Sequence, residues 1–143
     1  MNHPLTLGDS VLDEDHLRLE DLVLQLRDAP LDEVSRRLEA VREHASRHFA
    51  LEDIELRAMA DGNAKCHLDE HAAVLNSLDE VMVVLPQVDV AAEKKALLIN
   101  RLATELHVWL PGHVHEMDAG VASHRSKQRF GGAPVKIARR PGT

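Results

Sequence analysis

The chain has 143 residues, of which 44% are apolar and 29% charged, and this composition predicts one soluble globular domain. Cys66 is the only cysteine, so an intrachain disulfide framework and a cysteine-rich zinc or iron–sulfur site are excluded. We interpret Cys66 as a small buried core residue. One feature of the composition needs an explanation: the chain has ten histidines but only three aromatic residues, and no tyrosine.

Charge is distributed unevenly along the chain, whose formal net charge is −7. Residues 1–118 contain all 24 acidic and 11 basic residues, and an acidic body argues against nucleic-acid binding. Residues 119–143 contain six basic residues and no acidic one. We therefore predict a folded domain at residues 1–126 and a basic, flexible tail at residues 127–143, whose protein partner stays open.

The N-terminus has no basic stretch followed by an apolar run, and no window approaches the roughly 20 apolar residues of a membrane span. These observations favour a cytoplasmic protein that does not bind membranes. We expect a monomer or a weak homo-oligomer.

Four segments have the apolar spacing of amphipathic helices, and glycine, proline and Asp-Gly-Asn breaks separate them. Asp9 or Ser10 is the expected N-cap of the first segment. In chain order the segments cover about residues 10–28, 31–60, 64–85 and 90–113. Four such helices with short links predict an all-α, up-down-up-down four-helix bundle.

Pro111 conflicts with the fourth helix. A proline inside a helix removes one backbone hydrogen bond and costs about 3 kcal/mol. We therefore expect the fourth helix to be kinked or broken near Pro111, just before His113.

Polar residues interrupt the apolar stripes of all four segments. Residues four apart lie on one face of a helix, so His48 and Glu52 can converge, as can His67 and His71. A buried polar group without a partner costs about 1–3 kcal/mol, and a metal ion satisfies several such groups at once. The candidate ligands on the stripes are His16, His48, Glu52, His67, His71 and His113.

The types of donor narrow the choice of metal. Imidazole and carboxylate suit Fe, Zn, Mn or Cu. Five histidines exceed the four ligands of one tetrahedral zinc, so we predict two metal ions. The Glu-x-x-His motifs of ferritin-like di-iron bundles are absent, and no tyrosine can store a radical, which favours iron that binds a small ligand reversibly.

With these positions assigned, the sequence resembles the bacterial hemerythrins over roughly residues 7–124. The resemblance depends on several motifs in the right order, with 14 residues between Glu52 and His67. The motifs are Leu7-Gly8, Asp13-x-x-His16, His44-x-x-x-His48-Phe49-x-x-Glu52, Cys66-His67-x-x-x-His71 and Trp109-x-x-x-His113-x-x-x-x-Asp118.

The resemblance implies a non-haem di-iron centre in which an oxo or hydroxo group joins the two irons. One iron would take His67, His71 and His113. The other would take His16 and His48 and keep an open position for O2. Glu52 and Asp118 would bridge the two irons.

Asp118 is implied by the resemblance, aided by the distortion expected at Pro111, and not by regular helical spacing. It follows His113 by five residues, which places it about 140° away around an ideal helix. Met117 is the position that helical spacing predicts to face inward.

The resemblance also implies that Phe49, Trp109 and Leu110 wall the ligand pocket and slow autoxidation, although Phe49 and Trp109 could instead be ordinary core residues. The family's usual Glu-Glu pair is Glu52-Asp53 here, and we expect Asp53 not to touch a ligand. The remaining histidines are expected at the surface or beside the ligands: His3, His44, His107, His115 and His124.

The expected function is reversible O2 binding by a carrier, store or sensor, without catalytic turnover, and NO, azide and peroxide are further candidate ligands. Two alternatives stay open. The same centre could reduce or respond to peroxide or nitric oxide, or donate iron, as a di-iron enzyme would. The bundle could instead hold zinc or manganese in a structural or regulatory role.

Overall fold

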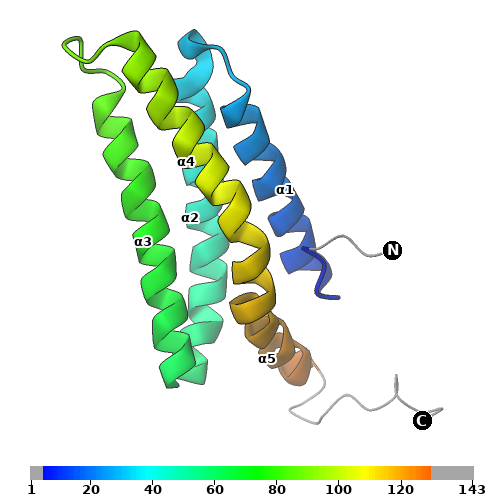
Figure 1. The fold of residues 1–143 in the computed structure, drawn as a ribbon. Coiled ribbons are helices and arrows are strands. Elements are labelled where there is room, and N and C mark those ends of the chain that lie inside the picture. The colour runs from blue at the N-terminus through cyan, green and yellow to red at the C-terminus, as the bar shows by residue number, and fades with distance from the viewer. Residues whose placement is uncertain (1–4, 130–143) are drawn as a thin grey trace.

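The computed structural model describes residues 5–129, which form a bundle of four long helices without a strand in this range. Neighbouring helices run in opposite directions: α2 packs between α1 and α3, and α4 packs mainly on α1 (Figure 1). The elements are α1 (Ser10–Arg27), the 3₁₀ turn η1 (Leu31–Glu33), α2 (Val34–Met59), α3 (Gly62–Val84), α4 (Ala92–His113), the π-helical turn η2 (Val114–Asp118) and α5 (Ala119–Arg129). The predicted all-α four-helix bundle is confirmed.

Specific residues fix where the helices begin and end. The Asp9 side chain accepts hydrogen bonds from the backbone N–H groups of Val11 and Leu12 and so caps α1. Ala60 ends α2 in the left-handed conformation with φ 53°, and Asp61 caps α3 by accepting from the Ala64 N–H. The link between α2 and α3 is therefore only two residues long, which fixes the candidate ligands of α2 relative to those of α3.

The apolar core has two parts. A large cluster fills most of the bundle, and a small cluster lies beside α5. The buried members of the small cluster each lie three or four residues from a candidate ligand, on the side toward the end of the bundle; they are Leu12, Leu56, Ala64 and Val121. The candidate site therefore lies between two apolar layers.

The distortion expected near Pro111 has a specific form. The α-helix is not broken at the proline, because α4 includes Pro111 and continues to His113. The irregularity begins at the next residue as the π-helical turn η2, in which the N–H of Ala119 bonds to the carbonyl of Val114, five residues earlier.

The end of the predicted domain and the predicted tail are only partly described. α5 continues to Arg129, past the predicted boundary at residue 126. The rest of the predicted tail, residues 130–143, lies outside the described residues, as does His3. None of the helices within residues 5–129 is long and apolar enough to cross a membrane.

Candidate metal centre

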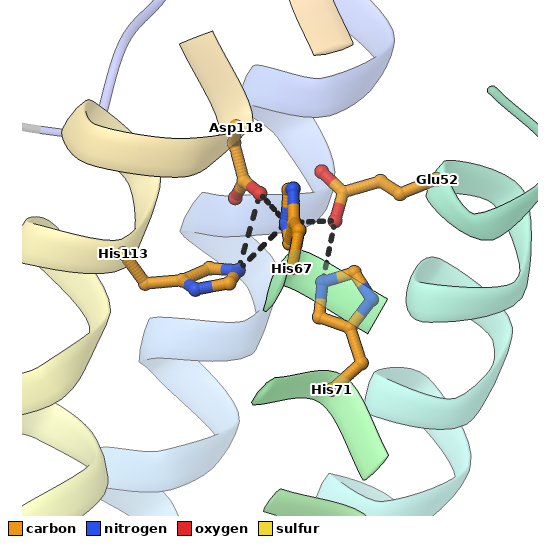
Figure 2. A group of neighbouring side chains, drawn as sticks. All are labelled: Glu52, His67, His71, His113 and Asp118. Carbon is orange, nitrogen blue, oxygen red and sulfur yellow. Dashed lines mark hydrogen bonds and ion pairs between the residues drawn. The ribbon is translucent and has the colours of Figure 1, made fainter. Parts of the chain in front are cut away.

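All seven candidate ligands converge in the core, although they come from five different elements. Each is at least 96% buried, and Glu52 is completely buried. Figure 2 shows how Glu52, His67, His71, His113 and Asp118 point toward one another between the helices. The full set is His16 from α1, His48 and Glu52 from α2, His67 and His71 from α3, His113 from α4 and Asp118 from η2.

The side chains form two overlapping groups, and in each group the ligand atoms lie within 4.8 Å of one another. The first group combines three histidines with two carboxylates: Glu52, His67, His71, His113 and Asp118. The second combines two histidines with the same two carboxylates: His16, His48, Glu52 and Asp118. Both carboxylates are therefore shared between the groups.

Glu52 presents one oxygen to each group. Its Oε1 lies 3.2 Å from His71 Nε2 and 3.9 Å from His67 Nε2. Its Oε2 lies 3.2 Å from His48 Nε2 and 3.7 Å from His16 Nε2. The carboxylate is therefore placed between the two sets of imidazoles.

Asp118 also presents one oxygen to each group. Its Oδ1 lies 2.7 Å from His67 Nε2 and 3.1 Å from His113 Nε2. Its Oδ2 lies 2.9 Å from His16 Nε2. Asp118, like Glu52, therefore lies between the three-histidine group and the two-histidine group.

The π-helical turn explains how Asp118 reaches the site. In an α-helix Met117 would face inward, but a π-helical turn bonds residue i+5 to residue i and contains more residues than an α-helical turn, so residue i+5 lies closer to the face of residue i. Asp118 thereby lies on the same face as His113 and is 1% exposed, whereas Met117 is only partly buried. Regular helical spacing could not identify this residue.

The donor set fits a bound metal. Several buried polar atoms of the site make no hydrogen bond within residues 5–129, and most of them face the centre of the two groups. They are His16 Nδ1 and Nε2, His48 Nε2, both Glu52 oxygens, His71 Nε2 and Asp118 Oδ1. Unbonded buried polar atoms are costly, and imidazole and carboxylate are the ligands that iron, zinc and manganese take.

Three further carboxylates hold the outer nitrogens of the histidines, and the sequence did not predict them. His48 Nδ1 lies 2.9 Å from Asp15, His71 Nδ1 lies 2.8 Å from Asp53, and His113 Nδ1 lies 2.6 Å from Glu70. A carboxylate here accepts a hydrogen bond from Nδ1–H and leaves Nε2 free to bind a metal. The expectation that Asp53 touches no ligand is wrong, because Asp53 contacts the ring of His71.

A signal for these three residues was present in the sequence. Asp15 directly precedes His16, Asp53 directly follows Glu52, and Glu70 directly precedes His71. Each is an acidic residue next to a candidate ligand, but its partner lies on another helix in every case.

The buried charges shift one another's pKa. Burial lowers the pKa of His48, but the hydrogen bond to Asp15 and the contact with Glu52 outweigh burial and raise the pKa to about 10. In the same way contacts with Asp118 raise the pKa of His16 and of His113 against the effect of burial. Burial raises the pKa of Glu52 and of Asp118, but the surrounding imidazoles hold both well below the usual range.

These shifts predict how the metal-free protein responds to pH. The pKa of His48 rises from 6.5 to about 10 on folding, so its protonation contributes stability that is fully present below pH 6.5 and is lost as the pH rises toward 10. We expect the melting temperature of the metal-free protein to fall between pH 6.5 and 9. The metal-loaded protein should lack this fall, because ligating imidazoles are neutral throughout the range.

Two variants make this measurement specific. His48→Gln should flatten the pH dependence of the metal-free melting temperature, whereas replacement of the exposed His115 by glutamine should leave it as in the wild type. Equal slopes for the wild type and His48→Gln would contradict the pKa shift.

The three predicted pocket residues do not line one common pocket. Phe49 is buried and its ring stacks on His71 with centroids 4.0 Å apart. Trp109 stacks on His113 with centroids 4.3 Å apart. Trp109 and Leu110 line one small, wholly apolar cavity in the core, and Phe49 is not part of its lining.

The other histidines are placed beside the site or at the surface. His44 is buried, stacks on His48 and donates from Nε2 to the backbone carbonyl of Asp15. His124 of α5 bonds to Glu55 of α2 across 2.9 Å. His107 lies 3.5 Å from Glu20, and His115 is exposed.

The prediction for Cys66 is wrong. The residue is exposed and lines an open pocket that also includes His67, Glu116 and Met117. The buried stripe of α3 passes through the next residue, His67, and one step along a helix turns a side chain about 100° away from that stripe.

Together the fold and the site define a class of protein: a four-helix bundle whose core holds a histidine–carboxylate centre suited to metal. The family model for the Hemerythrin HHE cation binding domain matches residues 7–123. The chain is 33% identical over 114 residues to a protein named Bacteriohemerythrin from Ralstonia nicotianae (strain ATCC BAA-1114 / GMI1000), a match that covers 80% of this chain and 79% of the relative. No solved structure matches the chain. The chain therefore belongs to the hemerythrin family, and the buried cluster indicates a non-haem iron site.

Proposed function

We propose that this protein binds O2 reversibly at a centre of two irons. His67, His71 and His113 would hold one iron, His16 and His48 would hold the other, and Glu52 and Asp118 would bridge them together with an oxo or hydroxo group. One observation carries the proposal: each shared carboxylate presents one oxygen to the three-histidine group and the other to the two-histidine group. When bound, an iron pair supplies the electrons for reversible O2 binding.

The unequal numbers of histidines support a ligand site at one iron. The three-histidine group offers five protein ligands to its metal, whereas the two-histidine group offers four. The metal beside His16 and His48 therefore has fewer protein donors, and we place the open position for O2 there.

The surroundings of the site support binding rather than turnover. The large apolar cluster lies on one side of the ligands and the small cluster on the other, and each candidate ligand is at least 96% buried. Exclusion of water limits the loss of protons and the side reactions that would oxidise the centre irreversibly. A small apolar cavity lined partly by Trp109 and Leu110 lies in the same core.

Absorbance during an oxygen cycle tests this proposal. The iron-loaded protein is reduced without oxygen, O2 is added, and oxygen is then removed while iron is counted in the same sample. We expect two irons per chain and charge-transfer bands that appear with O2, disappear on its removal and shift with azide.

Other outcomes would assign another function. Irreversible oxidation with release of peroxide, or rapid consumption of peroxide or nitric oxide, would contradict a carrier and indicate an enzyme or a responsive protein. A protein that takes zinc or manganese but not iron would indicate a structural or regulatory centre.

A further inference from the structure

Glu70 makes two hydrogen bonds through one oxygen, and both partners lie on α4. His113 donates from Nδ1 to Glu70 Oε1 across 2.6 Å, and Trp109 donates from Nε1 to the same oxygen across 2.9 Å. The Glu70 side chain is 32% exposed, whereas that of His113 is 1% exposed. Glu70 therefore reaches from α3 across to the buried face of α4.

The geometry sets the protonation state of His113. An ionised carboxylate is only an acceptor, so His113 must carry a proton on Nδ1. In the neutral ring Nε2 then carries the lone pair that binds a metal, and this atom lies 3.1 Å from both Asp118 Oδ1 and His67 Nε2. Glu70 thus directs the ligating nitrogen of His113 into the three-histidine group.

Trp109 restrains Glu70 and His113 together. Its indole N–H, which can only donate, bonds to Glu70. Its ring stacks on His113 at an interplanar angle of 26°. Trp109 and His113 are four residues apart, so they lie on the same face of α4. The three side chains therefore form a closed unit in which moving one disturbs the other two.

Glu70 differs in this respect from the other two outer carboxylates. Asp15 and Asp53 also hold imidazole nitrogens, but within residues 5–129 neither carboxylate accepts a hydrogen bond from a second side chain. We propose that Glu70 is a positioning residue for metal binding, which fixes His113 while Trp109 fixes Glu70. This inference rests on the proposed function only in requiring that His113 binds a metal.

The test compares Glu70→Gln with the wild type in two states of the protein. Glutamine keeps the size of the side chain but removes its charge. In the metal-free state, we expect the single indole N–H proton signal of Trp109 to move and the helix content to stay unchanged. In the iron-loaded state, we expect the chelator concentration that removes half of the iron to fall about 10- to 100-fold, because loss of such an outer partner weakens metal affinity by that factor.

Two matched variants separate positioning from general stability. Glu80→Gln changes an exposed glutamate on the same helix and should behave as the wild type in both states. Trp109→Phe keeps a ring against His113 but removes the indole donor, so its iron release should lie between those of the wild type and Glu70→Gln.

The outcomes are distinct from those of the oxygen cycle. Equal iron release by Glu70→Gln and the wild type, or an unchanged indole signal, would overturn the role of Glu70. A wild type that holds iron but does not cycle with O2 would contradict the proposed function. The comparison of Glu70→Gln with the wild type would still test the role of Glu70 in that case.

Discussion

Replacement of Glu52 by alanine is expected to abolish the binding of both irons. Glu52 is fully buried and belongs to both ligand groups, with one oxygen in each. Loss of an outer partner weakens metal binding about 10- to 100-fold, so loss of a shared ligand should exceed that range. Iron per chain, measured after gel filtration of protein loaded under anaerobic conditions, should fall from two to near zero.

A second variant tests whether both irons are lost because Glu52 is shared between the two ligand groups. His16 belongs only to the two-histidine group, so His16→Ala should keep about one iron per chain. Glu52→Gln preserves the shape of the side chain and should lose iron as Glu52→Ala does, which excludes a packing defect. Retention of one iron by Glu52→Ala would contradict a bridging role.

Replacement of Phe49 by alanine is expected to have the largest effect on stability. The side chain is 2% exposed, belongs to the large apolar cluster and stacks on His71. Such truncations cost about 3–5 kcal/mol of unfolding free energy. Urea unfolding of the metal-free protein measures this effect without a contribution from iron.

A milder variant tests the predicted pocket role of the same residue. Phe49→Leu keeps most of the apolar volume and should cost about 1 kcal/mol, while autoxidation of the oxygenated protein should become several-fold faster. Leu38 is a matched control because it is fully buried in the same cluster and lies ten residues, or about 15 Å, along α2 from His48. Leu38→Ala should reduce stability and leave autoxidation unchanged; equal autoxidation of Phe49→Leu and the wild type would make Phe49 a core residue only.

The fold and five histidines could be predicted because both follow from helical periodicity. His48 and Glu52, like His67 and His71, repeat at the spacing that keeps side chains on one face of a helix. That face must be buried in a bundle, so polar residues on it must meet. The structure brings these residues together at the positions that the spacing implies.

Asp118 could not be predicted from spacing because its position depends on a local change of helix type. The sequence indicates a disturbance at Pro111, but not that a π-helical turn would follow His113. Only the resemblance to a family assigned Asp118 to the site.

The three outer carboxylates could not be predicted for another reason. Asp15, Asp53 and Glu70 lie beside the buried stripe of their own helix and contact a histidine of a neighbouring helix. Which side chains meet across two helices depends on how the helices are rotated about their axes. That rotation is a property of the packed bundle and not of any one segment.

The π-helical turn η2 also links the shape of the backbone to the occupancy of the site. The same five residues wound as a regular α-helix would turn Asp118 away and bring Met117 inward, exchanging a hard oxygen donor for a soft thioether. Two metals bridged by Asp118, as proposed, would bind only the π form and by mass action would stabilise that form over the α form. Under this proposal, metal binding is coupled to the choice between π-helix and α-helix at this turn, so a change in either one would change the other.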